Sequence, residues 1–286
     1  MKKFFLSLIL ITGMSVMGFS QETNLYSFFL NIVSEEFRFP LIGFVNIANG
    51  NHNSPQFGFV NVNTNDFTGL QMSFVNTVGG NFTGAQLGFI NTALKEGKGL
   101  QLGFINTSVQ KLKGMQIGFV NYADSIEDGI PIGFISIVRD GGYKAIEYSF
   151  TEFYPINLGL KLGVEKFYTT IIAAYNPSGE VALEHFAFGL GIGSIIPINN
   201  SFFFNPELNA LSSFGDKKNI QLVSFVPYFG YKINKNFSVT AGPSVTWSHT
   251  DNDDEFQKPF FKIVDGVINE NNNITFGARI GVRFCF

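Results

Sequence analysis

The chain has 286 residues, including 35 phenylalanines and 31 glycines; 14% of its residues are charged and its formal net charge is −3. This apolar composition excludes a disordered chain, and without clustered lysine and arginine we expect no nucleic-acid partner. The one cysteine, Cys285, excludes an intramolecular disulfide and a thiol-rich metal site.

The N-terminus has the three parts of a secretory signal peptide. Two lysines precede an apolar run over residues 4–19, and the small residue Ser20 follows. The run is shorter than the roughly 20 residues of a transmembrane helix. The sequence therefore predicts a signal peptide over residues 1–20, cleaved before Gln21, and an N-terminal cap over residues 21–40.

A fifteen-residue repeat follows the cap. Each copy contains one six-residue motif, here called a word, and the seven words are LIGFVN, QFGFVN, QMSFVN, QLGFIN, QLGFIN, QIGFVN and PIGFIS. Their third letters lie fifteen residues apart, at Gly43, Gly58, Ser73, Gly88, Gly103, Gly118 and Gly133. A second glycine lies four residues before this third position in five copies, at Gly69, Gly84, Gly99, Gly114 and Gly129. Such self-similarity is typical of repeat architectures, so residues 41–142 are predicted to form a β-repeat domain.

The constant period predicts that like side chains stack. The phenylalanines would form one column: Phe44, Phe59, Phe74, Phe89, Phe104, Phe119 and Phe134. The asparagines would form an amide ladder at a corner: Asn46, Asn61, Asn76, Asn91, Asn106 and Asn121. The period-two pattern of the word places its Leu, Phe and Asn on one side, and we expect Phe89 to be nearly fully buried.

Two architectures fit this repeat. In a β-solenoid each copy is one coil, neighbouring phenylalanines lie roughly 5 Å apart, and seven coils make a rod of roughly 34 Å. In an antiparallel meander each copy is a hairpin, and the separation is roughly 10 Å. The constant register favours the solenoid. Half a repeat is too short to span a bilayer, so the repeats are expected outside the membrane.

Longer alternating strands begin at residue 143, and the last one is the clearest. One face of this strand is apolar: Ile274, Phe276, Ala278, Ile280, Val282, Phe284 and Phe286. The other face is small or polar: Thr275, Gly277, Arg279, Gly281, Arg283 and Cys285. This alternation over thirteen residues is typical of a transmembrane β-barrel strand, with its apolar face toward lipid.

At this strand the chain resembles bacterial outer-membrane β-barrel proteins. Their final strand ends in an aromatic residue preceded by apolar residues at alternate positions, as Phe286, Phe284, Val282 and Ile280 do here. The resemblance covers residues 143–286. It implies a location in the cell outer membrane, with two partners: outer-membrane lipid, and the assembly machinery that reads the final strand.

Alternating patterns predict about eight strands in this region. Their ranges are 143–153, 156–164, 166–175, 182–196, 200–211, 219–233, 236–248 and 273–286. Tight turns at 198–200 and 234–236 alternate with longer polar loops at 212–218 and 251–273, as in barrels with short periplasmic turns and long outer loops. This order predicts that the repeats lie on the periplasmic side. A soluble, secreted β-sandwich is the alternative fold.

The barrel pattern also predicts the contents of its interior. Five charged side chains fall on the inward face: Lys161, Glu165, Glu207, Arg279 and Arg283. An eight-stranded barrel is just wide enough for side chains to fill it, so opposite charges are expected to pair there. A charged ion pathway would require a wider barrel.

No residue pattern in the sequence predicts a catalytic, cofactor or metal site. His52, His185 and His249 share no metal-ligand spacing. Ser248 precedes His249 at a strand end, but neighbours on a strand point to opposite faces, which disfavours a hydrolase triad. The acidic run 251–255 lacks the spacing of a calcium loop and is expected to be solvated.

The sequence thus predicts an all-β protein with an N-terminal β-solenoid and a C-terminal barrel. The expected function is non-enzymatic, a structural or surface-interaction role that includes an unknown surface or periplasmic ligand. The alternatives are a barrel enzyme acting on envelope lipid and a narrow pore. The hydrolase needs serine, histidine and an acid at the rim, and the pore needs well over eight strands.

Overall fold

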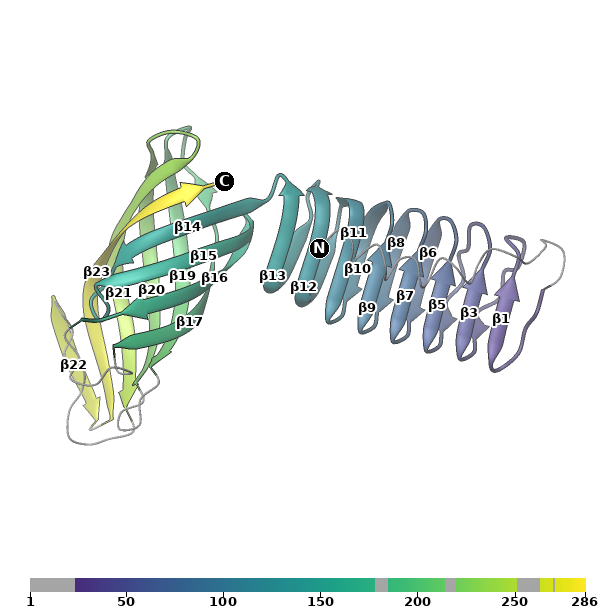
Figure 1. Cartoon of the computed structure of the whole chain (residues 1–286), viewed down its shortest axis with the longest axis horizontal. Coiled ribbons are helices and arrows are strands. Elements are labelled where there is room, and N and C mark those ends of the chain that lie inside the picture. Colours follow the sequence, from purple (N-terminus) through teal and green to yellow (C-terminus); the bar gives the residue numbers. More distant parts are fainter. Residues whose placement is uncertain (1–23, 178–184, 214–219, 251–262, 270) are drawn as a thin grey trace.

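A computed structural model of the chain describes residues 24–177, 185–213, 220–250, 263–269 and 271–286. All regular elements in these ranges are β-strands, which form a solenoid and a barrel (Figure 1). Among these residues no helix is long and apolar enough to cross a membrane. The predicted signal peptide and the acidic run 251–255 lie outside the described residues.

The repeats form the predicted parallel solenoid. One row of strands is β1 (Leu30–Val33), β3 (Val45–Ala48), β5 (Val60–Asn63), β7 (Val75–Val78), β9 (Ile90–Ala93) and β11 (Ile105–Leu112). The other row is β2 (Leu41–Ile42), β4 (Gln56–Phe57), β6 (Phe67–Met72), β8 (Phe82–Leu87) and β10 (Glu96–Leu102). The long strands β12 (Met115–Ile126) and β13 (Ile130–Asp140) end it. Paired residues are fifteen apart and parallel, as at Asn76 and Asn91, so the meander is wrong.

The seven phenylalanines stack in one column, as predicted. Neighbouring rings from Phe44 to Phe134 have centroids 4.8–5.1 Å apart and lie within 6° of parallel. The expected burial of Phe89 is wrong, because its side chain is 43% exposed. The chain bends at Gly88 and Phe89, which points the ring outward. Neighbouring rings cover its two faces, and its edge stays open.

Two amide ladders run through the solenoid interior beside apolar clusters such as that of Phe67, Val78 and Phe82. Each Asn Nδ2 donates to the Oδ1 of the next asparagine from Asn31 to Asn121, over 2.6–3.1 Å. A glutamine ladder, which the sequence analysis missed, runs through Gln56, Gln71, Gln86, Gln101 and Gln116, with bonds of 2.7–2.8 Å. The expectation that asparagine shares a side with phenylalanine is wrong. The bend between them breaks the alternation and turns asparagine inward, where its neighbours satisfy its amide.

Gly103 and Gly99, one from each glycine column of the repeat, both lie where a side chain would not fit. A Cβ atom on Gly103 would lie 2.1 Å from the carbonyl oxygen of Gly88, the equivalent residue one coil away. Gly99 has a φ of +122°, and its Cβ would lie 2.0 Å from the oxygen of Gly84. Close approach of coils at both columns, with a left-handed backbone at Gly99, explains this periodicity.

Residues from Tyr143 onward form a closed antiparallel barrel of eight strands, which confirms the predicted architecture. The strands are β14 (Tyr143–Phe150), β15 (Ile156–Val164), β16 (Phe167–Tyr175), β17 (Phe186–Gly193), β19 (Phe202–Ser213), β20 (Ile220–Lys232), β21 (Phe237–Thr250) and β23 (Asn272–Cys285). Pairing of β14 with β23 closes the barrel. The two-residue β18 (Ile196–Pro197) pairs with β19. The loop expected over 251–273 is partly wrong, because β22 (Val264–Asn269) pairs with β23 there.

The solenoid joins the barrel through its last coil. Strand β13 lies against β15 and β16 on the outside of the barrel wall (Figure 1). Val164 of β15 packs into a cluster with Leu112 and Val138 of the solenoid. The Thr169 hydroxyl donates to the carbonyl oxygen of Phe134 over 3.2 Å. The solenoid core thus continues onto the barrel wall.

Candidate functional site

The outer wall of the barrel is apolar, whereas its inner wall combines buried polar side chains with two apolar clusters. Apolar side chains face outward along every strand. Those of Ile146, Leu158, Phe188, Leu208, Phe225, Val245 and Ile280 are exposed, and that of Ile171 in β16 is half-buried. The residues between them are buried and mostly polar or small. This distribution confirms the alternation predicted for the final strand, and inverts the arrangement of a water-soluble barrel.

A group of buried ion pairs occupies the barrel interior near β15, β19 and β23. The Lys161 ammonium lies 2.5 Å from Glu207 and 3.2 Å from Glu147. The Arg283 guanidinium lies 2.6 Å from Glu147 and 3.3 Å from Glu207. Two cations and two anions therefore share contacts in one network. We call these four residues the lumen cluster.

Neutral groups complete the lumen cluster. The Tyr168 hydroxyl donates to Glu207 over 2.5 Å, and the Asn205 amide donates to the Tyr168 oxygen over 2.6 Å. The Asn205 carbonyl oxygen in turn accepts from Arg283 over 2.8 Å. These bonds fix the charged groups in place, which a buried ion pair needs to offset the loss of water.

A second buried pair lies next to the lumen cluster. Arg279 donates to both carboxylate oxygens of Glu152, over 3.0 and 3.1 Å. The same guanidinium donates to the hydroxyls of Ser224 and Thr246, and Thr246 also bonds to Glu152. This bidentate geometry is the strong form of an arginine–carboxylate interaction. The pair adds no net charge to the interior.

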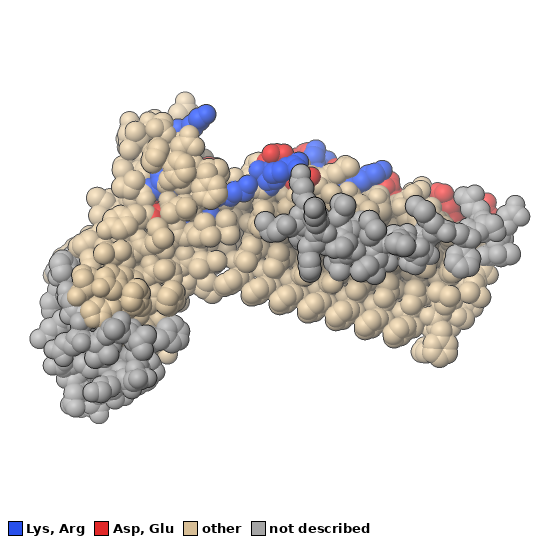
Figure 2. All heavy atoms as spheres, in the orientation of Figure 1, with Lys and Arg blue, Asp and Glu red and all other residues tan. Residues whose placement is uncertain are grey.

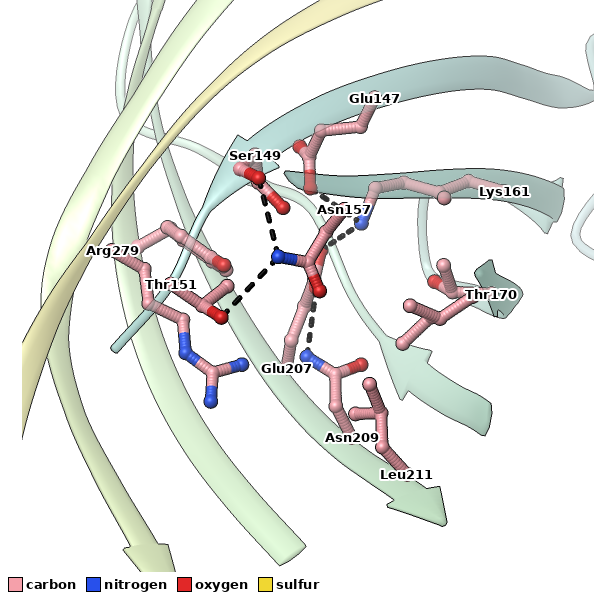
Figure 3. Close-up of a pocket in the computed structure, with 13 residues that line it drawn as sticks. Glu147, Ser149, Thr151, Asn157, Lys161, Thr170, Glu207, Asn209, Leu211 and Arg279 are labelled. Atoms are coloured by element: carbon pink, nitrogen blue, oxygen red, sulfur yellow. Dashed lines mark hydrogen bonds and ion pairs between the residues drawn. The ribbon is translucent and has the colours of Figure 1, made fainter. Parts of the chain in front are cut away.

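The interior leaves little free space around these groups. A cavity of about 20 Å³ is lined by polar residues that include Asn157, Thr170 and Asn209 beside the lumen cluster (Figure 3). Such a volume holds about one water molecule. The Asn157 amide donates to Ser149, Thr151 and Tyr154 across this space. Side chains fill the barrel at this level, as expected for eight strands.

Four of the five residues predicted to face the interior do so. Lys161, Glu207, Arg279 and Arg283 are buried. The placement of Glu165 is wrong: its side chain is 54% exposed and lies 3.8 Å from Lys232. Residue 165 follows the last residue of β15, so strand alternation no longer sets its direction.

The two acidic partners of these cations, Glu147 and Glu152, were not among the residues predicted to face the interior. Glu147 could have been found, because Ala145, Glu147 and Ser149 alternate with Ile146 and Tyr148 along β14 and are buried. Glu152 follows the end of β14, where alternation gives no direction. Only the fold brings it to Arg279.

The histidines do not gather into one site. His52 is buried in the solenoid, and burial, reinforced by Arg38, lowers its pKa below the usual 6.5. His185 lies beside Tyr175, and His249 beside Trp247. Ser248 is buried and bonds to the Asn273 carbonyl, whereas the His249 ring contacts Asn272. Within the described ranges no group of three or more His, Cys, Asp or Glu could hold a metal ion.

Comparison with known proteins gives no family for this chain. No family model, curated protein or solved structure matches it. The assignment of function therefore rests on the apolar barrel wall, the filled barrel interior and the solenoid.

Proposed function

We propose that the protein is a non-enzymatic component of a bacterial outer membrane, in which the barrel anchors the solenoid. The observation that carries this proposal is the closed eight-stranded barrel with its apolar outer wall and buried ion pairs. An apolar exterior needs lipid, because in water so large an exposed apolar surface favours aggregation. The balanced and filled interior suits an anchor better than a pore.

Aromatic side chains at one end of the barrel support a membrane setting. Neighbouring strands carry the contacting pairs Phe202–Tyr231, Phe204–Phe229 and Phe237–Phe284, with ring centroids 5.0–5.3 Å apart. This end also holds the short turns and Phe286. Aromatic girdles mark the membrane–water interface in outer-membrane barrels. We assign this end to the periplasm, where the assembly machinery would read the final strand.

The role of the anchored solenoid is structural or interactive. Its backbone groups pair from coil to coil along a rod, and its interior holds amide ladders and apolar clusters. Stacked coils present long continuous surfaces, and repeat proteins use such surfaces for binding. The solenoid would therefore be a fixed rod that the barrel holds beside the membrane.

Replacing Ile280 by arginine tests whether the barrel wall faces lipid. Ile280 is exposed near the middle of β23, so a charge there should reduce the free energy of unfolding by about 2–4 kcal/mol. The matched control is Ile233→Arg, in the short turn just after β20, with an expected cost of about 0–1 kcal/mol near the interface.

Denaturant titration in lipid vesicles measures the free energy of unfolding of both variants. The chain's one tryptophan, Trp247, lies in β21 and reports on the barrel. Equal small costs at Ile280 and Ile233 would contradict a lipid-facing wall.

A further inference from the structure

The solenoid carries an exposed apolar edge that the anchoring role leaves unexplained. Phe44, Phe59, Phe74, Phe89, Phe104 and Phe119 are each 43–56% exposed. With about 200 Å² per phenylalanine side chain, they expose roughly 550 Å². The neighbouring column adds Ile42, Met72 and Leu102. We call these two columns the Phe edge, and its area is at the upper limit for a soluble monomer.

Charge is absent from the Phe edge and collects on the opposite one. The seven words and the residue after each, such as 86–92, contain no Asp, Glu, Lys, Arg or His. Ion pairs between coils lie outside the words, at Lys111–Glu127, Lys113–Glu96 and Arg139–Asp124. Figure 2 shows lysine, arginine and acidic atoms along the upper edge of the solenoid, whereas its lower edge shows none.

The Phe edge is continuous with the outer wall of the barrel. Its phenylalanine column ends at Phe134, which stacks on Phe119 and whose carbonyl accepts from Thr169 of β16. Strands β3, β5, β7 and β9 begin just after these phenylalanines and run upward in Figure 1, so the Phe edge is the lower edge. It therefore points away from the barrel end that carries the short turns and the C-terminus.

We infer that the Phe edge is a second lipid-contact surface, by which the solenoid lies along the periplasmic leaflet beside the barrel. This inference rests on the proposed membrane location of the barrel. With the barrel axis along the membrane normal, the rod lies in the membrane plane, its Phe edge among acyl chains and its charged edge toward the periplasm. Amphipathic helices bind in the same way, with an apolar face about 5–10 Å into the interface.

This geometry modifies the expectation that the repeats lie wholly outside the membrane. Half a repeat is too short to cross a bilayer, and the solenoid does not cross it. Only its Phe edge enters the near leaflet. A second copy of the chain could cover an apolar edge too, but the direct continuation onto a wall that faces lipid favours the bilayer.

Site-directed spin labelling of the full-length protein in phosphatidylcholine–phosphatidylglycerol vesicles tests the inference. Cys285→Ser removes the native thiol, and single cysteines then replace Phe74, Phe89, Lys98 or Ile280. Lys98 is an exposed charged residue of β10 outside the words, and Ile280 is exposed on the barrel wall. Collision with oxygen, which concentrates in lipid, is compared with collision with a water-soluble nickel complex.

We expect the oxygen-to-nickel ratio at Phe74, Phe89 and Ile280 to exceed that at Lys98 several-fold. A lipid-like ratio at Ile280 with water-like ratios at both phenylalanines would overturn the inference and leave the barrel anchor standing. Water-like ratios at all four sites would overturn both.

The same labels also distinguish lipid contact from contact with a second copy of the chain. Spin–spin broadening at Phe74 and Phe89, with low oxygen contact, would show that a second copy covers the edge and would reject lipid. If a cysteine disturbs the phenylalanine stack, Ile42→Cys replaces it. Ile42 lies in the adjacent column and is exposed without belonging to the ring stack.

Discussion

Replacing Glu207 by glutamine is expected to reduce the free energy of unfolding of the barrel by about 3–5 kcal/mol, because it leaves a buried charge uncompensated. Glu207 contacts Lys161, Arg283 and the Tyr168 hydroxyl and is itself buried. With the carboxylate gone, two cations share Glu147 alone. Glutamine keeps the shape, so the loss reports charge and not a cavity.

The control for this variant is Glu165→Gln. Glu165 lies 3.8 Å from Lys232 at the exposed end of the barrel, where an ion pair contributes about 0–1 kcal/mol. Both variants are unfolded with denaturant in lipid vesicles and followed by Trp247 fluorescence. Equal stability of the Glu207 and Glu165 variants would show that the lumen cluster is hydrated and not sealed.

Replacing Asn91 by leucine is expected to destabilise the middle of the solenoid by about 3 kcal/mol. Asn91 accepts from Asn76 and donates to Asn106 and to the carbonyl of Leu102, each over 2.9 Å. Leucine has a similar size but forms none of these bonds, and it leaves the Asn106 oxygen buried without this donor. Lost bonds contribute about 1 kcal/mol each, and an unpaired buried group about 1–3 kcal/mol.

Thr92→Val is the matched control, because Thr92 is the next residue on β9 and its side chain is only half-buried. Hydrogen exchange of solenoid peptides in the intact protein measures the protection of their backbone amides in both variants. The Asn91 variant should lose protection by about a hundredfold, since 1.4 kcal/mol corresponds to tenfold. Unchanged protection would mean that the amide ladder contributes no net stability.

Period and alternation were sufficient to predict most of this fold. A period that never departs from fifteen residues allows parallel stacking at one strand spacing, and the Phe74–Phe89 separation of 4.9 Å follows from it. The bounds predicted for β15, residues 156–164, agree with the structure. Both are local properties, which a sequence records directly.

The predictions that failed depend on positions where the chain bends. At Phe89 a corner turned outward a ring that period-two alternation had placed with Asn91. At Glu165 the strand had already ended, so inward direction no longer applied. Glu152 reaches Arg279 across 127 residues, a contact that only barrel closure creates. Corners and closure depend on tertiary geometry, to which a single sequence gives no direct access.

Photo-crosslinking with lipids that carry a carbene precursor in the acyl chain tests the membrane assignment most directly. The full chain is reconstituted, illuminated and mapped by mass spectrometry. We predict lipid adducts on the outward residues of the barrel, such as Leu158, Phe188 and Ile280, and on the Phe edge, with none at Lys98 or in the lumen cluster. Adducts no more frequent than on a soluble protein, or spread equally over the charged edge, would contradict a barrel that sits in lipid.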